Sequence, residues 1–269
     1  MSTNKTNSEP APADHYYSSR PSVESRQSVV VYSLPGNAAP PLEFITDRGV
    51  FSKSRVDFGT DLLIRSLPPL SGRLLDLGCG FGAVGISLAL MNPGAEVWLS
   101  DINERAVKLC VENYSRIMSM RGAGGRTEII EKLICDEKTT CGKTITCNEK
   151  MLYDDKITCN EKMLCDEKTL FNKKIICSDG FMNLGDTLFD TVVSNPPIRT
   201  GKANVFRLYA DVYAHLNNGG ALYIVIQKKQ GLDSTVKELT CLFGNCEDIA
   251  RKAGYHVIKS TKLTGASTV

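Results

Sequence analysis

The stretch Leu74-Leu-Asp-Leu-Gly-Cys-Gly-Phe-Gly82 joins an apolar run to a glycine-rich turn. The apolar run predicts a buried strand over 73–77. Glycines at alternate positions over 78–82 allow the backbone to turn sharply and to approach a ligand closely. Residues 83–91 are compatible with a helix, and the first N–H groups of a helix have no partner within it. The stretch therefore predicts a nucleotide-type cofactor loop between a strand and a helix.

Strand and helix patterns alternate along the rest of the chain. This alternation predicts an α/β domain with a mostly parallel sheet and right-handed crossovers. The last strands follow one another too closely for a long crossover, which predicts an antiparallel C-terminal edge. Two early apolar runs, separated by turn residues, predict an N-terminal β-hairpin appendage. The expected hairpin strands are 28–33 and 42–46, the sheet strands are 73–77, 96–100, 175–179, 189–194, 221–226 and 255–260, the helices are 61–67, 83–91, 103–120, 206–216 and 236–243, and a turn is expected at 217–220.

Length and composition limit the classes of protein to which the chain can belong. With 269 residues, of which 42% are hydrophobic, the chain is long enough for one large domain, which we expect over 15–269. Residues 1–14 are polar, lack the apolar core of a signal peptide and are expected to form a disordered N-terminus. No apolar run approaches the roughly 20 residues that cross a bilayer, so a cytoplasmic protein is expected. The net charge of +2 and the pI near 8.0 do not by themselves indicate a nucleic-acid binder.

A near-exact six-residue repeat interrupts the domain at about 135–176. Cys occupies its first position at 135, 141, 147, 159, 165 and 177. The even period suits extended strands or a small solenoid-like stack, whereas the shortage of large apolar residues favours a disordered loop. The cysteines lack the Cys-x-x-Cys pairing typical of zinc sites, so no metal is expected. Because loop-closure entropy grows only logarithmically with length, we expect a peripheral insert.

The spacing of the cofactor loop alone leaves the class of cofactor open. Gly78, Gly80 and Ala83 also match the dinucleotide pattern G-x-G-x-x-G/A, and Asp101 follows at a suitable distance for a carboxylate that binds ribose. Asp76 favours a different cofactor. A carboxylate is unfavourable beside a pyrophosphate, but it stabilises a sulfonium and an ammonium group. We therefore expect an adenosine cofactor that carries positive charge.

A second motif, Asn195-Pro196-Pro197, ends the predicted strand 189–194, at the edge where open α/β sheets place their sites. The Asn195 side-chain oxygen and the Pro196 main-chain carbonyl can each accept a hydrogen bond from an amino group. These bonds favour the pyramidal geometry of a nitrogen that attacks an electrophile. The two prolines restrict the backbone that presents the acceptors. The motif therefore predicts a catalytic loop that acts on an amino nitrogen and depends mainly on positioning.

The glycine loop and the end of the following strand resemble two motifs of class I S-adenosylmethionine-dependent methyltransferases. Residues 75–82 resemble the first motif of that family, and Ser100-Asp101-Ile102 resembles the second. The resemblance implies a Rossmann-like class I methyltransferase fold with a mostly parallel seven-stranded sheet, and S-adenosylmethionine as cofactor. It also implies that Asp101 binds the ribose hydroxyls and that Asp179 contacts the adenine; the alternative for each is a cap or turn role. The implied cofactor-binding residues are Asp76, Gly78, Cys79, Gly80, Gly82, Asp101, Ile102, Asp179 and Asn195, and the implied catalytic residues are Asn195, Pro196, Pro197 and Ile198.

The string Asn195–Lys202 resembles, more narrowly, the methyltransferase small-domain family, whose bacterial members include the 16S ribosomal RNA guanine-N2 methyltransferase. The similarity covers nearly all of 15–262 except the repeat. It implies methylation of a guanine N2 in ribosomal RNA, and that RNA as partner. Phe51, Ser52 and Asp57 are implied to cover the cofactor, with packing of the N-terminal hairpin as the alternative for Phe51. The residues expected to hold RNA phosphates, with solvated surface charge as the alternative, are Arg199, Lys202, Lys228 and Lys229.

The residue after Asn-Pro-Pro leaves alternative substrates open. Methyltransferases that act on amino nitrogen usually have Tyr or Phe there, which stacks on the target, whereas this chain has Ile198. An apolar Ile still covers one face of a planar base. Adenine-N6 or protein-glutamine methylation through the same loop is one alternative hypothesis. Another is a catalytically inactive module that binds the cofactor and RNA.

Overall fold

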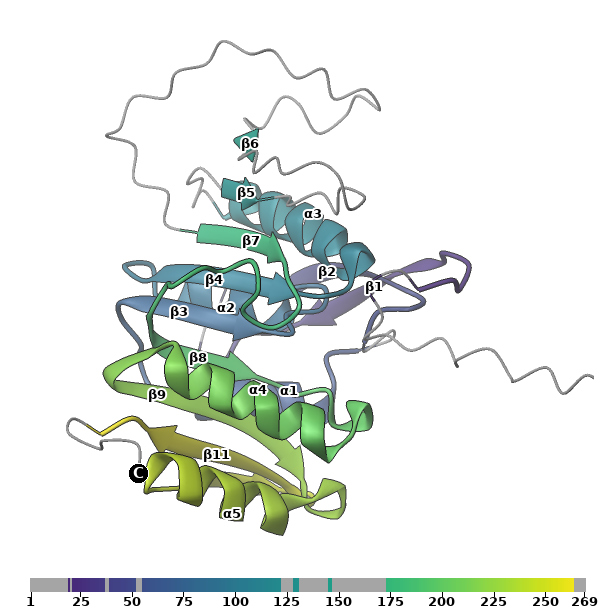
Figure 1. The fold of residues 1–269 in the computed structure, drawn as a ribbon. Coiled ribbons are helices and arrows are strands. Elements are labelled where there is room, and N and C mark those ends of the chain that lie inside the picture. Colours follow the sequence, from purple (N-terminus) through teal and green to yellow (C-terminus); the bar gives the residue numbers. More distant parts are fainter. Residues whose placement is uncertain are drawn as a thin grey trace, which may run out of the picture.

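A mixed β-sheet runs through the centre of the computed structural model, which describes residues 19, 21–36, 39–51, 55–121, 128–130, 145–146 and 173–263 (Figure 1). Within these residues nine strands are hydrogen-bonded in the order β10-β11-β9-β8-β3-β4-β7-β5-β6. Their bounds are β3 (Arg73–Leu77), β4 (Glu96–Asp101), β5 (Glu128–Ile130), β6 (Ile145–Thr146), β7 (Lys173–Cys177), β8 (Phe189–Ser194), β9 (Leu216–Gln227), β10 (Glu247–Lys252) and β11 (Tyr255–Thr261).

Seven consecutive strands of this sheet, from β10 to β7, confirm the predicted architecture. The neighbours among β9, β8, β3, β4 and β7 are parallel. β11 is antiparallel to β9, and β10 is antiparallel to β11, which gives the expected C-terminal edge. Beyond β7 the sheet adds the short β5, parallel to β7, and the two-residue β6, antiparallel to β5. The parallel strands therefore end together at one edge, where α/β folds place their sites.

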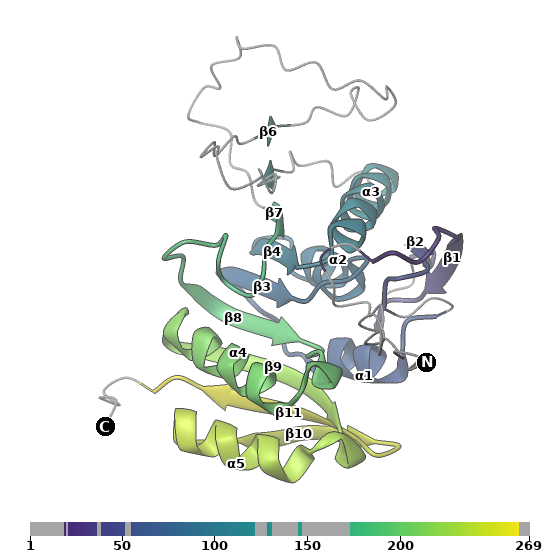
Figure 2. The same ribbon diagram turned by 45° about the vertical axis from the view of Figure 1, so that its right-hand side comes forward.

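Helices cover both faces of the sheet (Figure 2). Successive strand residues point to opposite faces, so Leu74 joins one apolar core and Leu75 the other. The first core packs under α1 (Phe58–Ser66), α2 (Ala83–Met91) and α3 (Glu104–Met120), and the second under α4 (Lys202–Ala214) and α5 (Leu232–Phe243). Three layers result, with the sheet between the two groups of helices.

The predicted N-terminal hairpin is present as β1 (Gln27–Tyr32) and β2 (Leu42–Asp47), paired antiparallel. The buried Asn113 of α3 joins it to the rest of the fold. Its Oδ1 accepts from the N–H of Ile45 at 2.7 Å, and its Nδ2 donates to the carbonyls of Ile45 and Phe81 at 2.8 and 2.9 Å. Phe44 also packs on Phe81, with ring centroids 5.5 Å apart. The hairpin is therefore fixed to the glycine loop that contains Phe81.

Several predicted boundaries were wrong. The turn expected at 217–220 lies inside β9, because Gly219 takes a φ of 81° that lets the strand continue through an irregular pairing with β8. The 61–67 helix begins at Phe58, since Asp57 caps it. α4 spans 202–214 instead of 206–216, and α5 begins at 232 instead of 236. β10 was not expected.

The polar N-terminus and most of the repeat lie outside the described residues. Of the range 135–176, residues 145–146 form β6 and the last four belong to β7, which begins at Lys173. The proposals of a disordered N-terminus at 1–14 and of a peripheral insert therefore stay predictions.

Candidate active site

A cavity of about 680 Å³ lies at the edge where β3, β4 and β8 end. The residues that follow these three strands line it, together with residues from the N-terminal part of the chain. The position matches the rule that open α/β sheets bind ligands outside the carboxyl ends of their strands. The cavity brings together most of the predicted site residues, namely Asp76, Gly78, Cys79, Gly80, Asp101, Ile102, Asp179, Asn195, Pro196, Pro197, Ile198 and Arg199, and also Phe51 and Asp57.

The glycine loop lies across the end of β4. The N–H groups of Gly78 and Cys79 both donate to the carbonyl of Ser100, at 2.8 and 2.9 Å. The N–H of Gly80 donates to Oδ2 of Asp101 at 2.8 Å. Gly78 and Gly80 have φ angles of 78° and 56°, the left-handed region that favours glycine. The loop and the Asp101 carboxylate therefore hold each other in place.

The carboxyl groups of the buried Asp76 and the half-buried Asp101 line the cavity. Burial raises the pKa of Asp76 to about 7, although the N–H of Gly85, 2.7 Å from its Oδ2, lowers it and the nearby Asp101 raises it. Burial also raises the pKa of Asp101 to about 6, against the lowering effect of three backbone N–H groups. A positive charge placed beside these two carboxyl groups would therefore stabilise their ionised forms.

Gly82 has a different position from the other glycines. It is not among the residues that line the cavity in the described part of the chain. It caps the N-terminus of α2 with a φ of 96°. A Cβ there would lie 2.8 Å from Cδ1 of Ile86 and 2.9 Å from Sγ of Cys110. The close packing of α2 and α3 therefore explains why position 82 is a glycine.

Asn195 is held by the first turn of α1. Its Nδ2 donates to Oγ1 of Thr60 at 3.0 Å and faces Oδ2 of Asp57 at 3.4 Å. The Thr60 hydroxyl also donates to Asp57, whose other oxygen accepts from the N–H of Gly59 at 2.9 Å. A carboxylate only accepts hydrogen bonds, so it fixes which end of the amide is NH₂. The Asn195 amide therefore directs its NH₂ toward α1 and leaves its Oδ1 on the other side.

The two prolines continue in a tight turn. The Pro196 carbonyl accepts from the N–H of Ile198 at 2.9 Å, and the Pro197 carbonyl accepts from the N–H of Thr200 at 2.9 Å. A carbonyl oxygen has two lone pairs, so the Pro196 oxygen can accept one further bond. Ser194, just before this turn, donates its hydroxyl to the Leu77 carbonyl at 2.7 Å. The Asn-Pro-Pro loop is therefore fixed directly beside the glycine loop.

The predicted phosphate-binding side chains separate into two groups. Arg199 lines the cavity. Lys202, Lys228 and Lys229 are exposed and, as far as the described residues go, lie outside the cavity lining. Nζ of Lys202 stands 5.0 Å from the ring centroid of Phe206. Of these four predicted phosphate-binding residues, the structure therefore places Arg199 in the cavity itself.

Sequence reasoning gave no site role to several lining residues, notably Thr60, Gln230 and Tyr255. Thr60 follows the predicted cover residue Asp57 by three positions, the spacing of a helix cap, which is a signal for its role. Gln230 and Tyr255 had no such signal. Gln230 follows the end of β9, which is parallel to β8. Tyr255 reaches the cavity because β11 runs antiparallel to β9, so that the start of β11 lies beside the end of β9.

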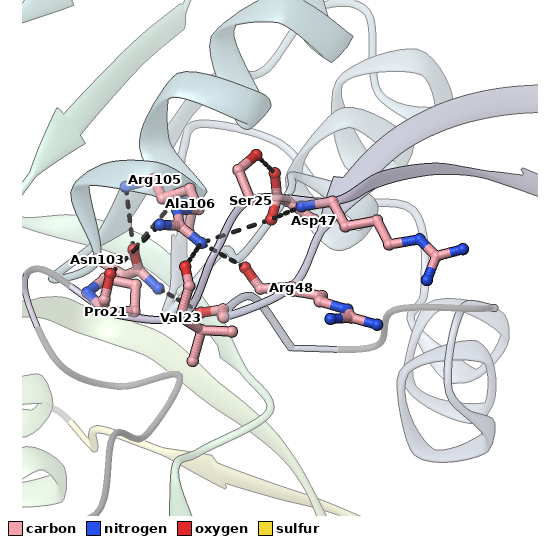
Figure 3. A network of polar contacts seen from close by, with 10 residues as sticks. Pro21, Val23, Ser25, Asp47, Arg48, Asn103, Arg105 and Ala106 are labelled. Carbon is pink, nitrogen blue, oxygen red and sulfur yellow. Dashed lines mark hydrogen bonds and ion pairs between the residues drawn. The ribbon is translucent and has the colours of Figure 1, made fainter.

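The N-terminal wall of the cavity is fastened by Arg105, at the start of α3 (Figure 3). The wall includes Val23 and residues 49–51. The Arg105 guanidinium donates to the carbonyls of Val23 and Arg48, at 2.8 and 2.7 Å, and lies 3.5 Å from the buried Asp47 carboxylate. Asn103, two residues earlier, donates to the Gly49 carbonyl at 2.9 Å. The wall is thus held by Asn103 and Arg105, which directly follow the cavity residues Asp101 and Ile102 in the sequence.

Replacing Arg105 with alanine should therefore loosen this wall. We expect the free energy of unfolding to fall by about 1–3 kcal/mol, because the carbonyls of Pro21, Val23 and Arg48 lose a donor and the buried Asp47 carboxylate loses its ion pair. Cofactor affinity should fall by about tenfold, measured by calorimetric titration beside urea unfolding. Lys108→Ala, an exposed change on the same helix, is the control. Unchanged cofactor affinity in Arg105→Ala would contradict the assigned role of this wall.

A glycine loop after β3, an acidic residue ending β4 and Asn-Pro-Pro ending β8 together define a class I methyltransferase site. The model of the methyltransferase small domain matches residues 41–135 and 155–259, and the chain belongs to this family. The predictions of an S-adenosylmethionine-dependent methyltransferase and of its cofactor are thereby confirmed. In the described part of the chain, no helix is long and apolar enough to span a membrane.

Individual relatives agree with the family assignment. The uncharacterized protein YbxB of Bacillus subtilis is 33% identical over 254 residues, which cover 93% of this chain and 100% of YbxB. Ribosomal RNA small subunit methyltransferase C of Shewanella amazonensis is 27% identical, over 90% of this chain and 55% of its own length. Ribosomal RNA large subunit methyltransferase G of Stutzerimonas stutzeri is 27% identical, over 83% and 47%. The chain spans about half the length of these two methyltransferases.

A solved structure shares the fold. The T. thermophilus 16S rRNA N2 methyltransferase, in complex with AdoMet and guanosine, superposes with a TM-score of 0.60 at 20% identity. The match covers 90% of this chain and 52% of that one. It confirms the predicted Rossmann-like fold with its antiparallel edge.

Proposed function

We propose that this protein transfers a methyl group from S-adenosylmethionine to the exocyclic N2 of a guanine in ribosomal RNA, 16S RNA being the first candidate, in the cytoplasm. The observation that carries the proposal is the orientation of Asn195. Its NH₂ is engaged by Thr60 and Asp57, so its Oδ1 is available to accept a hydrogen bond from an amino group. The names of the relatives support ribosomal RNA, of either subunit, as the substrate.

The cofactor end of the cavity has the donor and acceptor set that the proposal needs. In this proposal the buried Asp76 carboxylate faces the positive charge of the cofactor, and the Asp101 carboxylate, held by the N–H of Gly80, accepts from the ribose hydroxyls. When bound, S-adenosylmethionine supplies an electrophilic methyl group on a sulfonium. The proposed cofactor contacts are Asp76, Gly78, Cys79, Gly80, Asp101, Ile102, Asp179 and Asn195, with Phe51 in the covering wall.

The chain's own residues then act on the amino group. Asn195 Oδ1 and the Pro196 carbonyl each accept a hydrogen bond from one N–H of the amino group. These two bonds favour a pyramidal nitrogen with its lone pair exposed. Pro197 restricts the loop, and Ile198 covers a face of the base. Holding nitrogen and methyl group in near-attack geometry supplies much of the rate. The nitrogen takes the methyl group as the methyl–sulfur bond breaks, S-adenosylhomocysteine leaves, and the methylated nitrogen then loses one proton to water. Arg199, Lys202 and Lys228 bind phosphates of the RNA, a contribution that salt should weaken.

The test is to incubate the protein with labelled S-adenosylmethionine and ribosomal subunits from cells that lack the modification, then to analyse the nucleosides. N2-methylguanosine in the small-subunit RNA is the expected product. The same nucleoside in large-subunit RNA would keep the reaction and change the target. N6-methyladenosine, or label in protein alone, would overturn the proposed substrate. Cofactor binding without any transfer would favour the inactive binding module.

The raised pKa values predict how cofactor binding depends on pH. A bound cation favours ionised Asp76, so binding below pH 7 must release a proton, and affinity should fall as pH drops through 7. Release of one proton lets the affinity fall by at most about tenfold per pH unit. Below pH 6 the fall becomes steeper, because Asp101 also releases a proton on binding. Calorimetric titration between pH 5.5 and 8.5 measures the slope. S-adenosylhomocysteine, which lacks the sulfonium charge, should give a shallower slope, and Asp76→Asn should remove the slope above pH 6 while leaving the part that Asp101 contributes below it. A pH-independent affinity would contradict the role of Asp76.

A further inference from the structure

An aromatic side chain reaches the cavity from β11, the last strand of the fold. Because β11 is antiparallel to β9, its first residue, Tyr255, pairs with Gln227, the last residue of β9. The turn before it is tight, with φ values of 51° at Ala253 and 79° at Gly254. The N–H of Lys228 donates to the Gly254 carbonyl at 2.8 Å. Tyr255 is thus fixed at the edge of the sheet where the site lies, and it lines the cavity.

The Tyr255 ring is seated on the same helical turn that orients Asn195. A Cβ added to Gly59 would lie 2.9 Å from Cε1 of Tyr255, so this glycine is needed for the ring to lie where it does. The Phe58 ring packs on Tyr255 with centroids 5.5 Å apart. Gly59 lies between Asp57 and Thr60, the two residues bonded to the Asn195 amide. The ring therefore belongs to the Asn195 side of the cavity.

The catalytic loop lacks an aromatic residue of its own, because Ile198 follows Asn-Pro-Pro. We propose that Tyr255 supplies the aromatic face on which the target base stacks, and that it is a base-binding residue of this enzyme. The inference rests on the proposed function. Stacking of a base on an aromatic ring strengthens binding and tolerates any base, since every base has a π-face. Tyr255 therefore increases affinity for the extruded base, while Asn195 and Pro196 select its amino group.

Two substitutions separate stacking from the other properties of the side chain. Tyr255→Phe keeps the ring and removes the hydroxyl, whereas Tyr255→Leu removes the ring. Tyr213→Leu is the matched control. Tyr213 is also half-buried, and its ring packs on that of Phe243 with centroids 5.0 Å apart, but it is not among the described residues that line the cavity. Each variant is assayed for methylation of unmodified small ribosomal subunits, for binding of guanosine by equilibrium dialysis in the presence of S-adenosylhomocysteine, and for thermal unfolding.

We expect Tyr255→Leu to raise the KM for ribosomal subunits and the Kd for guanosine by about tenfold, while the Kd for S-adenosylhomocysteine stays within about twofold. Tyr255→Phe should restore both values, and Tyr213→Leu should leave them unchanged. A Tyr255→Leu protein that folds, binds the cofactor product and has a wild-type KM would overturn this inference alone. Equal losses of subunit and cofactor-product binding would show that Tyr255 only packs against Phe58, and would overturn it too. If the wild-type protein methylates no nucleoside, the proposed function fails first.

Discussion

Replacing Asn195 with alanine should lower kcat for methyl transfer by about 10²- to 10³-fold, the loss typical when an enzyme loses one preorganised hydrogen-bond partner of the transition state. The amino nitrogen of a base is a weak nucleophile because its lone pair is delocalised into the ring. Oδ1 of Asn195 is held in one orientation by Thr60 and Asp57, so it needs no reorganisation when the reaction begins. Alanine leaves the cavity shape nearly intact but removes this acceptor.

The measurement is single-turnover methylation of unmodified small ribosomal subunits at saturating cofactor. Cofactor affinity of Asn195→Ala should change by less than about tenfold, since Asp76 and Asp101 remain. Asn204→Ala is the matched control, because Asn204 lies on α4 with its amide bonded to the Thr200 carbonyl at 2.8 Å, away from the described cavity lining. A kcat of the Asn195 variant within a few-fold of wild type would remove Asn195 from the mechanism.

A companion variant, Thr60→Val, tests the orientation of the amide rather than its presence. Valine keeps the shape of threonine and removes the hydroxyl that accepts from Asn195 at 3.0 Å. The amide then retains only Asp57, at 3.4 Å, and we expect kcat to fall by about tenfold with an unchanged KM for the cofactor. An equal effect on both parameters would assign Thr60 to packing of α1 instead.

The central sheet could be predicted from the sequence because its strands are short, apolar and separated by strong turn signals. α2 was placed at its observed bounds for the same reason, between the glycine loop and Asn92-Pro93-Gly94. β10 was missed because its sequence, Glu-Asp-Ile-Ala-Arg-Lys, is polar, and an edge strand that is exposed on both faces carries no alternating apolar pattern. Asn217–Gly220 has strong turn residues and is an irregularity within β9, because Leu216 before it and Ala221 after it both pair with β8.

The candidate site was predictable only where function and local sequence coincide. Motif residues such as Asp76, Gly80 and Asn195 occur in short strings that themselves predict a loop. Thr60 and Tyr255 instead enter the cavity through tertiary contacts, Thr60 through the first turn of α1 and Tyr255 through the antiparallel return of β11. Gly82 shows the reverse case, because it belongs to the motif but its position is explained by packing against Ile86 and Cys110.

Replacing Asp101 with alanine should weaken cofactor binding by about 10²-fold or more, the second large effect that the site predicts. Asp101 has two tasks. Its carboxylate accepts from the N–H groups of Gly80 and Asn103, each at 2.8 Å, and so holds the glycine loop against α3. We also propose that it accepts the ribose hydroxyls. Charge-assisted hydrogen bonds contribute about 1.5–3 kcal/mol each, so losing two of them accounts for the expected change in affinity.

The Asp101 and Asn195 variants should differ in which kinetic parameter changes. Asp101 is not placed to contact the amino group, so saturating cofactor should restore kcat of Asp101→Ala to within about tenfold of wild type, whereas no cofactor concentration should rescue Asn195→Ala. Asp186→Ala, which removes an exposed carboxylate outside the described cavity lining, should leave both parameters unchanged. Wild-type cofactor affinity in Asp101→Ala would refute the ribose assignment. A kcat defect that persists at saturation would mean that the loop held by Asp101 also positions the reacting methyl group.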